Sequence, residues 1–423
     1  MKTHVERRQK AAAAQWNLKN EIVLVSAGDY IPIPGGADQT YLFRAHTEYF
    51  YLADRQRPGA VLAFDPQDGW SDFVPRVTQD ERVWIGASVA DEGISLEEFG
   101  PWLEKRKGRR IANLGCPIKG VQSDADLETE IREGLNVVRR PKDEVEIDRM
   151  RKAAEASRAG YAAVQPFLKP GVTERQAQVE LEAGFFRAGA ERTAYDSIVG
   201  GGPNSAVLHF FPSSRPFGAG ELILIDAGAE FGGYASDVTR TYAASGKFTP
   251  EQADIYKLVL AVEEAAVRRC MPGTEYKGIH LAASRQIAQG LLDLGLLKGN
   301  VDSLLEQDTQ ALFFPHGVGH LVGLGVRDAG GYLPGRKRSD TPGLRFLRID
   351  MPLLPGYTVT IEPGIYFVPA LLQDPELRRK HRDNVNWDRV DKMMNFGGIR
   401  IEDNIHVTET GYENLTAAIP KSM

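Results

Sequence analysis

The pattern of apolar and polar positions changes near Arg140, and this change divides the chain into two predicted domains. From about residue 20 to 135, apolar runs such as EIVLVSAG and GAVLAFDP alternate with helical stretches such as SLEEFGPWLEKRKG. That alternation is typical of a small α/β domain. After NVVRRPKDEVEI, the stretch DEVEIDRMRKAAEASRAGYAAVQPFL has the periodicity of a long amphipathic helix. We therefore predict an amino-terminal α/β domain over 1–140 and a second domain over 141–423.

The second domain shows signs of an internal duplication. Helices are predicted to begin at Thr173 and Thr249, because a glutamine follows each threonine by three residues, as in a capping box. Pro170-Gly171 and Pro272-Gly273 punctuate the two halves. We expect each half to contain two helices followed by strands. A pseudo-twofold arrangement would then bring strands of both halves into one central sheet, with helices on its outer face.

Two aspartates stand in a predicted hairpin of the first half. Apolar, β-branched runs near 221–230 and 233–242 flank a glycine-containing turn. A turn at Phe231-Gly232 would set Asp226 directly opposite Asp237, and directly opposed carboxylates repel unless a cation or proton lies between them. The alternative is a solvated hairpin face. Asp226 argues against it, because this residue interrupts the apolar run 222–225, where a lone carboxylate is costly.

Two glutamates repeat this arrangement in the second half. GYTVTIEPGIYF and GGIRIEDNIHVTETG are predicted strands that contain Glu362 and Glu402, so a second carboxylate pair on adjacent strands is expected. His316 and His320 lie in the glycine-rich PHGVGHLVGLGVRD. Their spacing alone is a weak signal. Several carboxylates with one imidazole suit Mn²⁺ or a similar hard-to-borderline ion, whereas structural zinc favours thiolates and more histidines.

Composition excludes some classes of protein. The chain has 423 residues, of which 42% are hydrophobic, so length alone predicts two or three domains. A net charge of −6 gives no excess of basic residues of the kind that binds nucleic acid. No apolar run approaches a membrane span, and the start of the chain resembles a short amphipathic helix, not an export signal. Two cysteines, Cys116 and Cys270, are too few for a disulfide framework, so we expect a cytoplasmic protein.

Four motifs resemble, in order and spacing, those of the pita-bread metallopeptidases, a family that includes the prolidases and aminopeptidases P. They are IDAGAEFGGYASDVTRTY, PHGVGHLVGLGVRD, TIEPGIYF and GGIRIEDNIHVTETGYENLT. The resemblance spans roughly residues 140–420. It implies an α/β (α+β) protein whose catalytic domain has the pita-bread fold with duplicated ααββ halves.

The resemblance also implies a dinuclear metal site. The expected ligands are Asp226, Asp237, His320, Glu362 and Glu402, with Asp237 and Glu402 bridging two divalent ions. Mn²⁺ is the first expectation, and Co²⁺ and Zn²⁺ are alternatives. A metal-bridging hydroxide would attack the peptide carbonyl, and Glu362 would carry a proton to the leaving nitrogen. The substrate would be a small peptide with proline in second position, and relatives are commonly homodimers.

Within the family, PGLRFLRIDMPLLPGYTVTIEPGIYFVPALLQDPELR is similar to the longer prolidases. There an arginine at the place of Arg348 grips the carboxylate of a dipeptide, a task that suits a guanidinium. The alternative for Arg348 is a surface ion pair. We therefore expect a prolidase, with aminopeptidase P acting on longer Xaa-Pro peptides as the alternative and a non-catalytic binding module as a third hypothesis.

One position departs from the family. Most relatives have a histidine in a V-H-D triplet, where this chain has Val326-Arg327-Asp328. Arginine can donate hydrogen bonds to an anion but cannot act as an acid or base near neutral pH. We expect Arg327 to contact substrate or an oxyanion, and a salt bridge to Asp328 or another acid is the alternative.

Three further residues complete the expected site. His209 is expected to act in catalysis, and a buried core histidine without a catalytic role is the alternative. It is followed by Phe210, where the family more usually has tyrosine. His316 is expected in the wall of the substrate pocket. Arg400 is grouped with the residues around the substrate and is expected to pair with the metal-binding carboxylates. The alternative is an ion pair without a mechanistic role.

Overall fold

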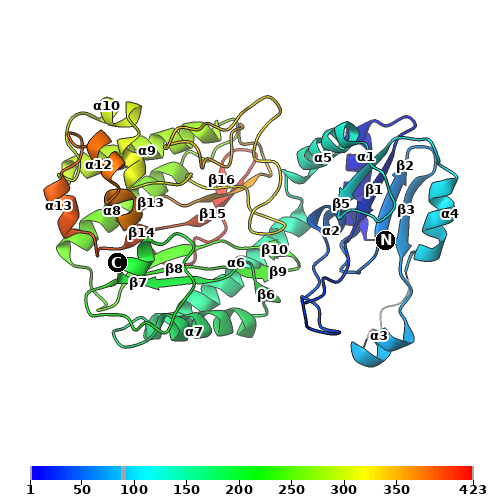
Figure 1. The fold of residues 1–423 in the computed structure, drawn as a ribbon, viewed down its shortest axis with the longest axis horizontal. Coiled ribbons are helices and arrows are strands. Elements are labelled where there is room, and N and C mark those ends of the chain that lie inside the picture. Colours follow the sequence, from blue (N-terminus) through cyan, green and yellow to red (C-terminus); the bar gives the residue numbers. More distant parts are fainter. Residues whose placement is uncertain (1, 87–91, 422–423) are drawn as a thin grey trace. The chain divides into compact units, whose positions relative to one another are not determined.

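A computed structural model describes residues 2–86 and 92–421 of the chain, which divides into two compact units, Met1–Arg140 and Pro141–Met423 (Figure 1). Each unit has its own sheets, helices and buried apolar residues. In the described part of the chain, none of the helices is both long and apolar enough to cross a membrane.

The first unit is built around one five-stranded sheet with the order β4-β3-β2-β1-β5. Strand β1 pairs in parallel with β5 and antiparallel with β2. Its strands are β1 (Ile22–Ser26), β2 (Val61–Asp65), β3 (Gly69–Val74), β4 (Ile94–Ser95) and β5 (Ile111–Gly115). Its helices are α1 (Thr3–Trp16), α2 (Thr47–Ala53), α3 (Gln79–Trp84), α4 (Phe99–Glu104) and α5 (Ala125–Arg139). The mixture confirms the expected α/β character.

The first half of the second unit begins with two helices that pack against each other. These are α6 (Glu144–Val164) and α7 (Glu174–Arg187), of which α7 lies below β7 (Ile198–Gly201) and β8 (Leu222–Asp226) in Figure 1. Thr173 caps α7 through the predicted box with Gln176. The strands of this half are β6 (Arg192–Thr193), β7 (Ile198–Gly201), β8 (Leu222–Asp226), β9 (Ala229–Phe231), β10 (Tyr234–Ala235) and β11 (Thr239–Ala243). Buried apolar residues of α6 and α7 pack against β8.

The second half repeats this order. Thr249 caps α8 (Pro250–Val267) through its box with Gln252, and α9 (Tyr276–Asp293) follows. The later helices are α10 (Val301–Glu306), α11 (Pro369–Leu372), α12 (Pro375–Lys380) and α13 (Trp387–Lys392). The strands are β12 (Thr358–Ile361), β13 (Gly364–Tyr366), β14 (Gly398–Arg400), β15 (Asp403–Val407) and β16 (Tyr412–Asn414). Helices followed by strands in both halves give the pita-bread arrangement.

The predicted register of the first hairpin was wrong. Asp226 pairs with Thr239, and Phe231 pairs with Tyr234, so the turn falls at Gly232-Gly233. Both glycines have positive φ, +57° and +81°, as a two-residue hairpin turn requires, and Phe231 would be strained there. Asp237 is therefore a diagonal neighbour of Asp226 on the same face, not its direct partner.

The directly opposed carboxylates are those of the second half. Gly364 pairs with Arg400 and Ile361 pairs with Asp403, so the same antiparallel register places Glu362 opposite Glu402. Glu362 lies between β12 and β13 and Glu402 between β14 and β15, so the two glutamates stand next to the paired strands and not inside them, as was expected.

Short contacts join the two halves at their strands. The amide of Glu402 donates to the carbonyl of Thr239 over 3.1 Å. Asn404 exchanges two hydrogen bonds with the backbone of Asp237, at 2.9 and 2.6 Å. The segments that carry Asp237 and Glu402 are thus fixed against each other by hydrogen bonds.

Close packing of α6 and α7 generates a stability prediction. A Cβ on Gly184 would lie 2.5 Å from the Cα of Gly160, so Gly184→Ala must push the helices apart. We expect urea unfolding to show a loss of about 1–3 kcal/mol. Gly278→Ala in α9 is the control, because its Cβ would meet nothing within 4 Å; it should raise stability by up to about 1 kcal/mol. An unfolding free energy for G184A at or above that of G278A would contradict this packing.

Candidate metal centre

The expected site residues all line one cavity of about 550 Å³ in the second unit. The cavity collects residues that lie far apart in sequence. They are Asp226, Asp237, His320, Glu362, Glu402, His209, His316, Arg327, Arg348 and Arg400. Apolar side chains, among them Phe210, Phe211 and Phe346, complete the lining.

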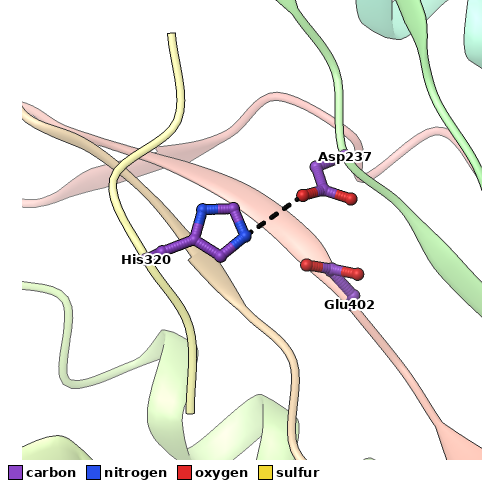
Figure 2. Close-up of side chains that lie close together, drawn as sticks. All are labelled: Asp237, His320 and Glu402. Carbon is purple, nitrogen blue, oxygen red and sulfur yellow. Dashed lines mark ion pairs between the residues drawn. The ribbon is translucent and has the colours of Figure 1, made fainter. Parts of the chain in front are cut away.

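Three side chains form the tightest group within this cavity (Figure 2). Asp237, His320 and Glu402 each offer a ligand atom, and these atoms lie within 4.8 Å of one another. His320 Nε2 is 3.3 Å from Asp237 Oδ2. All three residues are buried. Buried groups of this kind, converging on one point, are the donors that a divalent cation requires.

The imidazole of His320 is oriented for ligation. Its Nδ1 lies 2.9 Å from the carbonyl oxygen of Leu321, which can only accept, so Nδ1 carries the proton. The lone pair is therefore on Nε2, which faces the carboxylates. Burial alone would lower the pKa of His320, but the bond to Asp237 and the charges of Asp237 and Glu362 raise it above its ordinary value.

The two glutamates carry strongly perturbed carboxyl groups. Burial raises the pKa of Glu362 to about 7, against the opposing charges of His320 and Arg400. Burial, followed by the charges of Asp237 and Glu362, holds the pKa of Glu402 well above its usual range. Glu362 Oε1 lies 3.8 Å from His320 Nε2, and its Oε2 lies 3.8 Å from His316 Nδ1.

Asp226 is tied to the cluster through its neighbours. The hydroxyl of Tyr195 lies 2.6 Å from Asp226 Oδ1 and 2.5 Å from Asp237 Oδ1, so it bridges the two aspartates. Arg400 donates to the other oxygen of Asp226 over 2.5 Å. Burial raises the pKa of Asp226, and the Arg400 charge opposes this shift.

Arg400 faces the carboxylates and not the open cavity. Besides Asp226, its guanidinium donates to the hydroxyls of Thr239 (3.0 Å) and Tyr366 (2.7 Å). Only 3% of the side chain is exposed. These bonds place Arg400 among the groups that hold the ligands, although it was grouped with residues around the substrate.

His316 is fixed as a neutral imidazole in the cavity wall. Its Nδ1 donates to the carbonyl of Gly317, and its Nε2 accepts from the hydroxyl of Tyr366, each over 2.8 Å. Burial, with the nearby Arg400 charge, lowers the pKa of His316 to about 3.

The remaining expected residues lie toward the rim. His209 and Arg327 are exposed, and Arg348 is half-buried. Desolvation and the Arg327 charge lower the pKa of His209. The alternative salt bridge from Arg327 to Asp328 is not formed, because Asp328 pairs with Lys142 at 3.0 Å.

Sequence reasoning missed three hydroxyl groups that position the ligands. Tyr195 has no signal in spacing, since it precedes Asp226 by 31 residues. Thr239 was detectable, because it lies two residues after Asp237 on the same face of a strand; it donates to Glu402 Oε2 over 2.7 Å. Tyr366 stands in the motif of Glu362, four residues further on.

The residues present fit a divalent metal site. Four carboxylates converge in this cavity, and the guanidinium of Arg400 pairs directly with one of them, that of Asp226. Buried carboxylates this close repel each other unless cations or protons intervene. Oxygen donors with a single imidazole form the set that hard-to-borderline ions prefer.

Fold and site together define a pita-bread metallopeptidase. Residues 148–409 match the model of metallopeptidase family M24, and residues 4–99 match the aminopeptidase P amino-terminal domain. The chain belongs to metallopeptidase family M24, in its aminopeptidase P branch.

Individual relatives agree along nearly the whole chain. A probable Xaa-Pro aminopeptidase from Botryotinia fuckeliana is 33% identical, covering 90% of this chain and 86% of the relative. The structure of Pseudomonas aeruginosa aminopeptidase PepP matches with a TM-score of 0.80 at 31% identity, over 99% of this chain and 95% of that one. Zinc-substituted Escherichia coli aminopeptidase P with product matches with a TM-score of 0.79 at 29% identity, over 99% and 96%.

The Tyr195 bridge generates a prediction for metal binding. Tyr195→Phe removes the hydroxyl that orients both aspartates, so we expect Mn²⁺ affinity by titration calorimetry to fall by about tenfold or more. Tyr242→Phe is the matched control, because Tyr242 does not line the cavity and its hydroxyl bonds to none of the described residues. Equal Mn²⁺ affinity in both variants would show that the Tyr195 bridge does not support the site.

Proposed function

We propose that this metallopeptidase is an Xaa-Pro aminopeptidase, which releases the first residue from peptides with proline in second position. The main support is the similarity to aminopeptidases P over almost the entire chain, in both units. The relatives thus favour the alternative expectation over the prolidase that the Arg348 segment suggested. The exposure of Arg327, Phe211 and Phe346 at the rim is consistent with a peptide that continues beyond proline.

We further propose that Asp226, Asp237, His320, Glu362 and Glu402 hold two divalent ions, with Asp237 and Glu402 shared between them. Mn²⁺ is the first candidate, and Co²⁺ and Zn²⁺ are the alternatives. When bound, such ions polarise the scissile carbonyl and lower the pKa of a water molecule, which supplies the nucleophile. The support is the convergence of these side chains on one cavity.

The protein's own side chains would then orient the peptide and move a proton. Glu362 faces the cavity between His316 and His320, from where its carboxyl group can take a proton from water and deliver it to the proline nitrogen. His209 and Arg327, at the rim, can donate hydrogen bonds to the substrate carbonyl. His316, held neutral by Tyr366, forms part of the wall.

Proline recognition is assigned to the apolar part of the same cavity. Phe210, Phe211 and Phe346 line it beside the polar cluster, and a proline ring is an apolar ligand that such side chains can cover. Arg348 is proposed as the partner of a substrate carboxylate.

Location and assembly are further parts of the proposal. Cys116 and Cys270 are free, consistent with the reducing cytoplasm. A homodimer is expected from the resemblance, and light scattering of the purified protein tests it.

A substrate-length series tests the main proposal. With Mn²⁺ restored, we expect Xaa-Pro-Xaa tripeptides to be cleaved at least as fast as Xaa-Pro dipeptides, because the rim leaves space beyond proline. Release of the first residue is followed by chromatography, and a chelator should abolish it until Mn²⁺ is returned. Cleavage of dipeptides alone would restore the prolidase hypothesis.

Replacement of the proposed proton carrier gives a second test. Glu362→Gln keeps the shape of the side chain but cannot exchange a proton, so we expect kcat to fall by roughly 10²–10⁴-fold. The metal content of the variant is measured beside its kinetics, because Glu362 is also a proposed ligand. A variant with full metal content and near-native kcat would rule out this role for Glu362.

A further inference from the structure

A cluster of two acids and two bases lies behind the segment that carries Glu402. Its members are Arg240 on β11, Glu263 on α8, Asp403 at the start of β15, and Lys421. Arg240, Glu263 and Asp403 are buried, and 20% of the Lys421 side chain is exposed. Other residues line the cavity of the candidate metal centre. The cluster is therefore separate from the groups that would contact metal or substrate.

Asp403 is the centre of this cluster. Its Oδ1 accepts from Arg240 over 2.8 Å, and its Oδ2 lies 2.5 Å from Lys421 Nζ. Two residues further along the chain also donate to its oxygens, Asn414 and Thr416. Asp403 directly follows Glu402, and successive side chains of an extended segment point to opposite faces. One short segment thus carries a proposed metal ligand on one face and the centre of the cluster on the other.

Arg240 connects Asp403 to the backbone of Glu402. Its Nη1 donates to the carbonyl oxygen of Glu402 over 2.7 Å, while its Nη2 donates to Asp403. The same guanidinium donates to the carbonyls of Ile419 and Pro420 over 2.7 and 3.0 Å. The backbone that bears the Glu402 side chain is thus held between β11 and the segment around Pro420.

Lys421 fastens that segment to α8. Its Nζ lies 2.8 and 2.9 Å from the two carboxylate oxygens of Glu263, and its carbonyl accepts from the hydroxyl of Tyr256 over 3.1 Å. Burial, followed by the charge of Asp403, raises the pKa of Glu263 to about 8, and the Lys421 charge opposes this shift. Lys421 therefore compensates two buried carboxylates that would otherwise repel each other.

We propose that Lys421 is a positioning residue for metal binding, which acts through Asp403 on the proposed ligand Glu402. Because Lys421 holds Asp403 against α8, the preceding residue, Glu402, keeps its carboxylate directed into the cavity. This inference rests on the proposed metal site and adds to it a residue that contacts neither metal nor substrate. Loss of a group that orients metal ligands costs about 10–100-fold in metal affinity.

Lys421→Met tests this role, because methionine keeps much of the length of the side chain and removes its charge. We expect the Mn²⁺ affinity of the metal-free protein, measured by titration calorimetry, to fall by about tenfold or more. Lys421→Arg, which can still pair with both carboxylates, should retain most of the native affinity. Lys257→Met is the control, because Lys257 is exposed on α8 and pairs with Asp254 at 4.0 Å; it should keep the full affinity.

A double variant separates positioning from stability. Lys421→Met leaves Glu263 buried without its cation, so the metal-free protein should unfold at a lower temperature. Combining Lys421→Met with Glu263→Gln removes the unpaired acid as well, and part of the lost Tm should return. Mn²⁺ affinity should stay low, because Asp403 still lacks Lys421. Affinity that recovers together with Tm would show that Lys421 acts on stability alone.

Failure of this inference is distinguishable from failure of the proposed metal site. Equal Mn²⁺ affinity of the native protein and Lys421→Met would overturn the positioning role and leave the metal site intact. A native protein that binds no Mn²⁺ would overturn the site itself. At saturating Mn²⁺, KM for Ala-Pro-Ala should stay near its native value in Lys421→Met, because Lys421 does not line the cavity. A KM raised several-fold with unchanged Mn²⁺ affinity would also count against the role.

Discussion

The backbone bond between Glu402 and Thr239 is the contact on which the site depends. It joins a strand of the second half to a strand of the first. Because side chains alternate along strands, one such bond fixes which face each neighbouring residue occupies. For this reason the side chains of Asp237 and Glu402 converge on the same point. The side chain of Asn404 stabilises the arrangement, because it accepts from the amide of Asp237 and donates to its carbonyl.

Charge compensation is the second constraint. The cavity concentrates acids that cannot all be ionised in a buried space without cations. The protein contributes Arg400, held by Asp226, Tyr366 and Thr239, and leaves the remaining compensation to metal ions. Behind the site, Arg240 donates to the carbonyl of Glu402 over 2.7 Å and to Asp403 over 2.8 Å. The strand that carries Glu402 is thus anchored independently of its own carboxylate.

The two corrections have identifiable causes. The register of the first hairpin was wrong by two positions, because the turn uses Gly232-Gly233, whose positive φ angles a two-residue turn demands. The error did not change the face on which Asp226 and Asp237 lie, since a shift of two preserves alternation. The preference for a prolidase depended on one segment around Arg348, and a single arginine cannot decide whether a pocket ends after proline or continues.

Local chemistry made much of this protein readable from its sequence. The capping residues Thr173 and Thr249 predicted where α7 and α8 begin. The strands beside Glu362 and Glu402 were predictable because β-branched runs and flanking glycines are local features of the sequence. The motifs around the acids identified the family for the same reason. Tertiary structure alone decided how Tyr195 bridges two aspartates, that Asp328 pairs with Lys142, and that Arg400 pairs with Asp226. These facts depend on contacts between segments distant in sequence, and such contacts leave no periodicity or spacing from which they could be read.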